Sequence, residues 1–290
     1  MLQPIASAIR APAAWCFAAV WAASGVLLAL RGEAELALLG LGQLTGVLAL
    51  TWIMLLVTAP VEWPPERGGS WRSRSQLAVV ALAVVLTGVD GMVFHRVGPT
   101  WLGSIPLWSG LVRALLLGGQ ALRLGASFSN LVTYVILPLA ILLALGVRAA
   151  QLGLTRSRST ARVLAVWATL PALGALAEVV LGGRPPLALL MTLAGNVLQN
   201  GFSEEFLFRG ALLTRVAAEA GPAWGVVVSS LVFGLWHLGA NWSGVHGDPV
   251  AAACAGICTQ GSLGLGLGMV FVRTRSLLAG TVVHILLDAV

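Results

Sequence analysis

Charged side chains are scarce in this sequence. Only 10% of its 290 residues are charged, and lysine is missing altogether, so all 17 basic residues are arginines. A soluble domain averages about 25% charged residues. With 58% hydrophobic residues and a mean hydropathy of +0.92, the composition excludes an ordinary soluble protein and predicts an all-α, polytopic transmembrane helical bundle.

The arginines also limit the class of partner. They stand singly or in small groups between apolar runs, as residues that flank a membrane do. The formal charge of +6 therefore does not indicate nucleic-acid binding, and the expected surroundings are a lipid bilayer.

Cysteines are few, and no disulfide framework is expected from them. The three are Cys16, Cys254 and Cys258, and all lie in apolar runs. Cys254 and Cys258 are four residues apart, which places them on one face of a helix. Metal binding is the alternative, but free cysteine behaves as a small hydrophobic residue, and we favour buried thiols.

Several signatures of membrane proteases are missing too. The sequence has no His-Glu-x-x-His, the motif that binds zinc on a helix. Residues 88–91 read Gly-Val-Asp-Gly, which is not the Gly-x-Gly-Asp of intramembrane aspartyl proteases, and no Gly-x-Ser-Gly of rhomboid proteases is present. Any catalytic site must therefore come from other residues.

Apolar runs of roughly 18 residues or more predict spanning helices. We expect about eight or nine, the last one short, at residues 13–30, 36–57, 77–94, 128–147, 161–181, 187–213, 222–239, 250–272 and 276–290. Arg113 and Arg123 interrupt residues 105–124, which are predicted to form an interfacial or re-entrant amphipathic helix. Loop arginines are more numerous on the side of the N-terminus, so we predict a multi-pass protein of the cell membrane with a cytoplasmic N-terminus.

One stretch places three ionisable groups inside a long apolar run: Ser203-Glu204-Glu205-Phe206-Leu207-Phe208-Arg209-Gly210. Such groups at bilayer depth are a functional-site hypothesis by default. Glu205 and Arg209 are four residues apart and can form an ion pair on one helix face. Glu204 points about 100° away. Steps of four back from Glu204 reach Asn200 and Asn196, so a polar stripe is expected on its face.

Further polar residues fall in two later apolar runs. His237 follows Phe233 by four residues, and Asp288 follows His284 by four, so each pair shares a helix face. At 1.5 Å per residue, Glu204, His237 and His284 lie roughly 13, 22 and 12 Å from the cytoplasmic ends of their helices. Clustering of these groups would let each satisfy another, which lowers the cost of burial.

The residue types indicate the chemistry. A carboxylate and an imidazole can together hold and deprotonate a water molecule. Glu204, His237 and His284 also form a ligand set that fits Zn²⁺, with water as the fourth ligand. A second histidine beside an acid can donate hydrogen bonds to a developing oxyanion. The sequence thus predicts hydrolysis of a carbonyl compound inside a membrane.

Three motifs occur in order: Glu204-Glu205-x-x-x-Arg209, Phe233-x-x-x-His237 and His284-x-x-x-Asp288. Together they resemble the CPBP family, which comprises the CAAX proteases and bacteriocin-processing enzymes, also called Abi family intramembrane proteases. The resemblance covers roughly residues 160–290. It suggests a division into N-terminal transmembrane helices without an assigned role (1–125) and an intramembrane protease core (126–290).

The resemblance implies a role for each residue. Glu204 would activate water, His237 would help to hold that water or a metal, and His284 with Asp288 would support the water and the oxyanion. Glu205 and Arg209 would fix the helix geometry, with Asn200 and Phe233 in support. Many members have Asn where this chain has Asp288. Because an ionised Asp would repel an oxyanion, Asp288 is expected to be protonated or to face a cation.

The expected function is therefore that of an integral membrane endopeptidase with a peptide or protein substrate. Prenylated C-termini are one implied substrate class, and Zn²⁺ is the one cofactor to consider. Two alternatives stay open: a membrane scaffold or regulator that has the fold without turnover, and a proton-coupled carrier. Against the carrier, the motif helices have no repeat in the other half of the chain, and many carriers are built from repeats.

Overall fold

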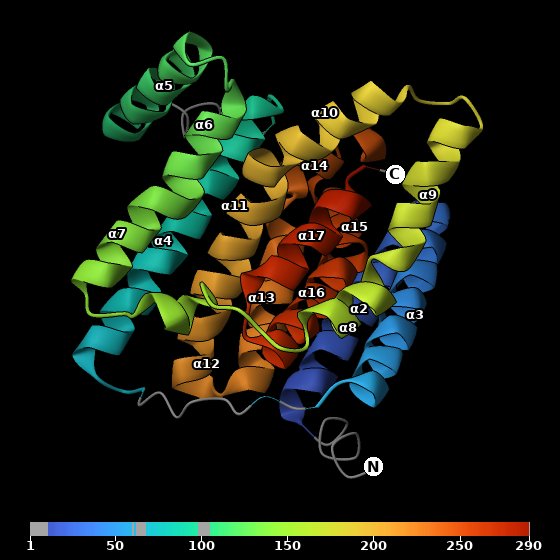
Figure 1. Cartoon of the computed structure of the whole chain (residues 1–290), viewed down its shortest axis with the longest axis horizontal. Coiled ribbons are helices and arrows are strands. Elements are labelled where there is room, and N and C mark those ends of the chain that lie inside the picture. Colours follow the sequence, from blue (N-terminus) through green and yellow to red (C-terminus); the bar gives the residue numbers. More distant parts are fainter. Residues whose placement is uncertain (1–10, 60, 62–67, 98–104, 290) are drawn as a thin grey trace. The chain divides into compact units, whose positions relative to one another are not determined.

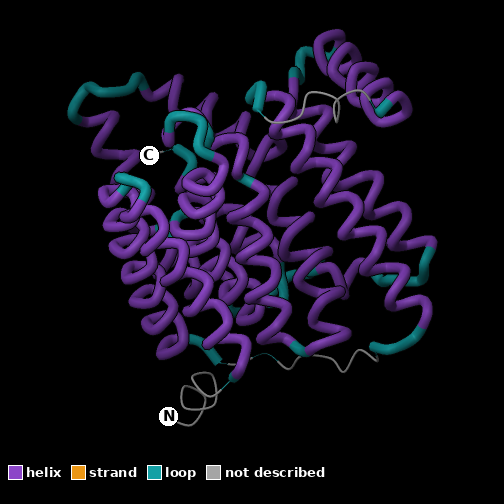
Figure 2. The backbone as a smooth tube through the Cα atoms, turned by 180° about the vertical axis from the view of Figure 1, so that it is seen from behind, coloured by secondary structure: helices purple, strands orange, loops and turns teal. Residues whose placement is uncertain are grey.

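A computed structural model of the chain describes residues 11–59, 61, 68–97 and 105–289. The structure is 83% helix, and Figure 2 shows helices joined by loops, with no strand among the described residues. The predicted all-α class is confirmed.

Five helical segments are long and apolar enough to cross a membrane, within the described ranges. They are Pro12–Leu30, Ala34–Val57, Trp71–Phe94, Ala126–Ala144 and Pro249–Thr274. A sixth arises if Thr160–Trp167 and Thr169–Val180, which meet at a bend of 53°, form one span. This number is lower than the eight or nine expected from apolar runs. The difference arises because other predicted runs fold into short apolar helices, such as Pro222–Trp236 and Leu277–Leu287.

Residues 105–124, predicted to be amphipathic, contain helix α5 (Pro106–Ala121). The helix has 16 residues, and Gly119 is its one buried residue. It is too short for a span at 1.5 Å per residue. Its position at a membrane surface stays a prediction.

The chain forms two compact units, each made from segments distant in sequence. Among the described residues, the first comprises 11–49, 68–97 and 212–269, and the second comprises 50–59, 61, 105–211 and 270–289. The division predicted at residue 125 separates segments by function. The two compact units do not test it, and it stays a prediction.

The helices of the first unit carry the Phe233 and His237 motif. They are α2 (Pro12–Leu30), the first part of α3 (Ala34–Val57), α4 (Trp71–Phe94), α12 (Thr214–Ala220), α13 (Pro222–Trp236), α14 (Leu238–Asn241), η6 (Ser243–Val245), α15 (Pro249–Cys258) and most of α16 (Gln260–Thr274).

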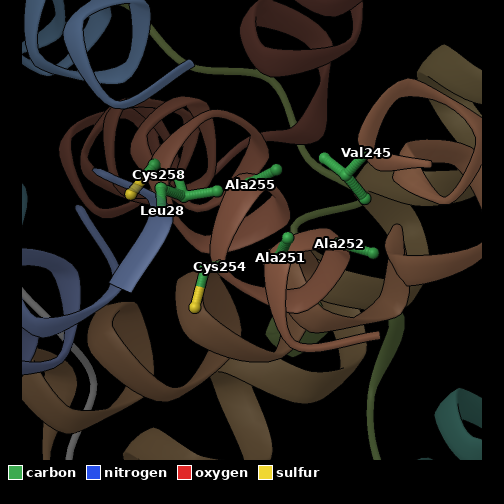
Figure 3. Close-up of a cluster of buried hydrophobic side chains, with 7 residues drawn as sticks. All are labelled: Leu28, Val245, Ala251, Ala252, Cys254, Ala255 and Cys258. Atoms are coloured by element: carbon green, nitrogen blue, oxygen red, sulfur yellow. The ribbon is translucent and has the colours of Figure 1, made fainter. Parts of the chain in front are cut away.

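Small side chains dominate one core cluster of this unit. Figure 3 shows Cys254 and Cys258 there, with Leu28 of α2 and the alanines of α15. Both thiols are free and buried, as the sequence predicts. Trp21 of α2 donates its indole N–H to the Ser262 hydroxyl at 2.9 Å. Small residues let these helix backbones approach closely, which is how helices associate in a membrane.

The helices of the second unit carry the two glutamates and His284. They are the end of α3, α5, α6 (Ala126–Asn130), η2 (Leu131–Ile136), α7 (Leu137–Ala144), η3 (Ala149–Leu152), α8 (Thr160–Trp167), α9 (Thr169–Val180), α10 (Pro186–Asn196), η4 (Val197–Gly201), α11 (Phe202–Glu205), most of η5 (Phe206–Leu213), the end of α16, and α17 (Leu277–Leu287).

Helix α17 packs against α8, α9, α10, η4 and α11, and it lies beside α11 in Figure 1. Its first turn is fixed to the loop that precedes α8. Leu277 donates its backbone N–H to the carbonyl of Gly153 at 3.0 Å, and the Ser276 hydroxyl donates to the carbonyl of Thr155 at 2.6 Å. These bonds fix where His284, two turns further on, lies along the helix.

Candidate active site

The helical run from Pro186 to Ala220 is interrupted by two π-helical segments, η4 and η5, which flank α11. A π-turn pairs each residue with the fifth along rather than the fourth, and such turns occur often at functional sites. Here the Ser203 hydroxyl donates to the carbonyl of Leu198, five residues back, at 2.5 Å. The predicted stripe assumed a regular α-helix. The spacing of four that aligned Asn196 with Asn200 and Glu204 therefore does not apply across η4.

Glu205 is the centre of the buried contacts in this site. Its Oε1 atom accepts a hydrogen bond from Arg209 Nη1 at 2.8 Å, so the predicted pair is present. Both side chains are almost completely buried, with 1% and 0% exposed. The same oxygen lies 3.0 Å from Nδ1 of His284. Because a carboxylate oxygen accepts, Nδ1 donates, and Glu205 thereby links the arginine to the histidine.

The other ring nitrogen of His284 faces two more carboxyl groups. Nε2 lies 3.7 Å from Glu204 Oε2 and 3.8 Å from Asp288 Oδ1. Asn200 donates from Nδ2 to Asp288 Oδ2 at 3.2 Å. Of the predicted cluster of Glu204, His237 and His284, the approach of Glu204 to His284 is present in the second unit, and Asp288 lies at the same ring nitrogen. Asp288 faces the imidazole of His284, and the expectation that it is protonated or faces a cation stays a prediction.

Two glycines allow α17 to approach the motif helix this closely. A Cβ atom on Gly280 would lie 2.7 Å from Glu205 Oε2. A Cβ atom on Gly201 would clash with the side chain of Ile285. Neither glycine was identified from the sequence, nor was the bond between Glu205 and His284. Gly280 lies one turn before His284, and that spacing is the signal that could have indicated a close helix contact.

His237 belongs to the first unit, where it follows the last residue of α13. Its Nδ1 atom lies 2.8 Å from the carbonyl oxygen of Phe233. A carbonyl oxygen only accepts, so Nδ1 carries the proton and Nε2 of the neutral ring is an acceptor. The Phe233 ring packs edge-on against the imidazole, with centroids 4.6 Å apart. Phe233 thus fixes both the tautomer and the plane of His237.

A catalytic zinc ion needs three protein ligands that converge on one point. Over the described ranges, no group of three or more His, Cys, Asp or Glu side chains has a geometry that could hold a metal ion. The predicted zinc set combines Glu204 and His284 of the second unit with His237 of the first. That set stays a prediction.

Residues 186–290 match the family model described as Type II CAAX prenyl endopeptidase Rce1-like. The match begins at the first residue of α10 and contains all three motifs. It is consistent with the resemblance to CAAX proteases, a family of membrane peptidases. Together with the apolar helices, it indicates an integral membrane protein. Neither the curated proteins nor the solved structures contain a match to the chain.

Proposed function

We propose that this chain is an intramembrane endopeptidase in which Glu204 is the general base that activates water. The observation that carries the proposal is the buried Glu204 carboxylate facing Nε2 of His284, whose other nitrogen is held by Glu205. The match of residues 186–290 to a prenyl endopeptidase family supports the peptide bond as the target.

Charge balance supports Glu204 as the proton acceptor. The site groups three carboxyl groups, Glu204, Glu205 and Asp288, with the Arg209 guanidinium and the His284 imidazole. Even with His284 protonated, three negative charges exceed two positive ones. Excess charge is costly in a buried site, so uptake of one proton from water neutralises the group. Glu205 is held by Arg209 and by Nδ1 of His284, whereas Glu204 faces Nε2 of the same ring, and we assign the proton transfer to Glu204.

The proposed reaction begins at Glu204, which takes a proton from water while the water oxygen forms a bond to the carbonyl carbon of the peptide. The oxygen of the resulting oxyanion accepts a hydrogen bond from Nε2–H of protonated His284. Asp288 faces the same ring nitrogen. Glu204 returns the proton to the leaving nitrogen as the C–N bond breaks. The products are one new carboxyl group and one new amine.

His237 is proposed to hold the attacking water through Nε2, which accepts because Nδ1 donates to Phe233. If a Zn²⁺ ion were bound, Glu204, His237 and His284 would be the residues to hold it, and it would supply Lewis-acid activation of water. Prenylated peptides with a C-terminal CAAX sequence are the proposed substrates, and the proposed site of action is the cell membrane, with a cytoplasmic N-terminus.

The test uses the full chain in detergent or in lipid vesicles, with farnesylated and plain peptides of the same sequence. Hydrolysis in H₂¹⁸O should place one ¹⁸O atom in the new carboxyl group, read by mass spectrometry, and the farnesylated peptide should be preferred. Lack of cleavage of both peptides by well-folded protein would favour the scaffold instead. Solute flux into vesicles that depends on Glu204, without cleavage, would favour the carrier.

Gly280→Ala tests the packing that holds Glu205 against His284. The added methyl group would lie 2.7 Å from Glu205 Oε2 and must displace the carboxylate. Overpacking of this kind costs about 1–3 kcal/mol, so we expect a lower melting temperature and about a tenfold lower kcat/KM.

Gly195→Ala is the matched control, because Gly195 is also helical and a Cβ atom added there would meet no atom within 4 Å. Alanine is favoured over glycine in a helix by about 1 kcal/mol, so this variant should keep its activity and its melting temperature should not fall. Equal behaviour of the two variants would contradict the role given to Gly280.

A further inference from the structure

Most threonine hydroxyls in the described helices of this chain follow one pattern. They donate to the carbonyl oxygen four residues back, as side chains of this type do within helices. The pattern holds at Thr45, Thr58, Thr87, Thr133, Thr169, Thr192, Thr259 and Thr274. In an apolar environment this bond satisfies the hydroxyl within its own helix.

Thr281 departs from the pattern. It lies in the middle of α17, and only 8% of the residue is exposed. Its Oγ1 atom is buried and has no hydrogen-bond partner among the residues that the structure describes. A buried hydroxyl that makes no hydrogen bond costs free energy, so the fold alone gives no reason for a hydroxyl here.

The position of Thr281 on α17 indicates a role for its hydroxyl. His284 follows it by three residues and Asp288 by seven, spacings that place all three on one face of α17. This is the face on which His284 contacts Glu204 and Glu205. The distance from Thr281 to His284 along the helix axis is about 4.5 Å. An extended peptide rises about 3.3 Å per residue, so in a peptide lying along α17 a peptide bond next to the one facing His284 comes close to the level of Thr281.

We propose that the Thr281 hydroxyl is a substrate-positioning group, which donates a hydrogen bond to a backbone carbonyl oxygen of the bound peptide next to the bond that is cleaved. The proposal rests on the proposed peptidase function. It follows from the chemistry of a peptide in a membrane, where each backbone carbonyl must find a donor inside the protein. A threonine whose hydroxyl already donates to a carbonyl of its own helix cannot serve as that donor.

The experiment compares Thr281→Val, which removes the hydroxyl at nearly constant volume, with Thr281→Ser, which keeps it. We expect Thr281→Val to lower kcat/KM about tenfold, the equivalent of one lost hydrogen bond, mainly through a higher KM. Thr281→Ser should stay within about threefold of the parent protein. The melting temperature of Thr281→Val should be unchanged or higher, because an unsatisfied buried hydroxyl is gone. A merely structural threonine would not show reduced activity together with retained stability.

Thr51→Val is the matched control. Thr51 of α3 is also 8% exposed, and its Oγ1 atom likewise has no partner within the described ranges. This variant should match Thr281→Val in stability and the parent protein in kcat/KM. Parent-like kcat/KM and KM in Thr281→Val would overturn the inference while the peptidase function stands.

A binding measurement separates the two proposals. In a Glu204→Gln background, the Kd of a fluorescent farnesylated peptide is measured with and without Thr281→Val, and a rise of about tenfold is expected. An unchanged Kd overturns the positioning role. If the parent protein binds the peptide without cleaving it, the peptidase proposal fails, and the change in Kd still decides the role of Thr281. Absence of both binding and cleavage overturns both.

Discussion

Glu204→Gln is expected to lower kcat/KM for peptide cleavage about a thousandfold, because general-base catalysis contributes about 10² to 10⁴ to an enzymatic rate. Glutamine keeps the volume and one carbonyl oxygen but cannot accept the proton of the attacking water. The variant also lacks the negative charge that faces Nε2 of His284. Steady-state cleavage of the farnesylated peptide measures the effect, with circular dichroism as the check on folding.

Glu178→Gln is the control for this substitution. The Glu178 side chain is 36% exposed and forms an ion pair with Arg184 at 3.2 Å, so its loss should leave kcat/KM within about twofold, as expected for an exposed ion pair. Full activity in Glu204→Gln would remove Glu204 from the reaction and leave another group to activate water.

Arg209→Met should have the second largest effect, and this one is on stability. It leaves the Glu205 carboxylate buried without the guanidinium that lies 2.8 Å away in the parent protein. Removing one partner of a buried pair costs about 3–5 kcal/mol, which corresponds to a melting temperature lower by on the order of 10 °C. Activity should fall as well, because Glu205 also holds Nδ1 of His284.

A double-mutant cycle with Glu205→Gln isolates the pair. The combined variant should be more stable than Arg209→Met alone, because it no longer buries a carboxylate that has lost its guanidinium partner. Arg158→Met, at an exposed arginine, is the control and should leave the melting temperature unchanged. Additive effects of the two buried substitutions would show that the ion pair contributes nothing to the fold.

The local parts of the site could be predicted from the sequence. The spacing of four indicates the Glu205–Arg209 pair, because the contact depends on one helix only. The cost of burying polar groups predicts that Glu204 and His284 meet. The bond between Glu205 and His284 was missed, because it depends on how two helices are rotated against each other. That rotation is set by side-chain packing and by the close approach at Gly280. The helical periodicity of the sequence gives no information about it.

The number of spans could not be predicted for a related reason. Counting apolar runs assumes that each run is one straight helix. In this chain the run that holds both glutamates is divided into α10, η4, α11, η5 and α12, and the end of the chain forms an apolar helix of 11 residues. Hydropathy indicates whether a segment can lie in an apolar environment. The length of each helix and the bends within it depend on how the neighbouring helices pack.

The two π-helical segments determine how the motif helix responds to changes in length. A π-turn holds one residue more than an α-turn. A single deletion within Val197–Gly201 or Phe206–Leu213 can therefore be absorbed by conversion to regular α-helix, with both flanks kept in register. Phe202–Glu205 is regular α-helix and has no extra residue that could absorb a deletion within it. Such a deletion would rotate the residues that follow it by about 100° about the helix axis, so that one glutamate would point where the other points now. The directions of the two carboxylates therefore depend on the length of this one turn.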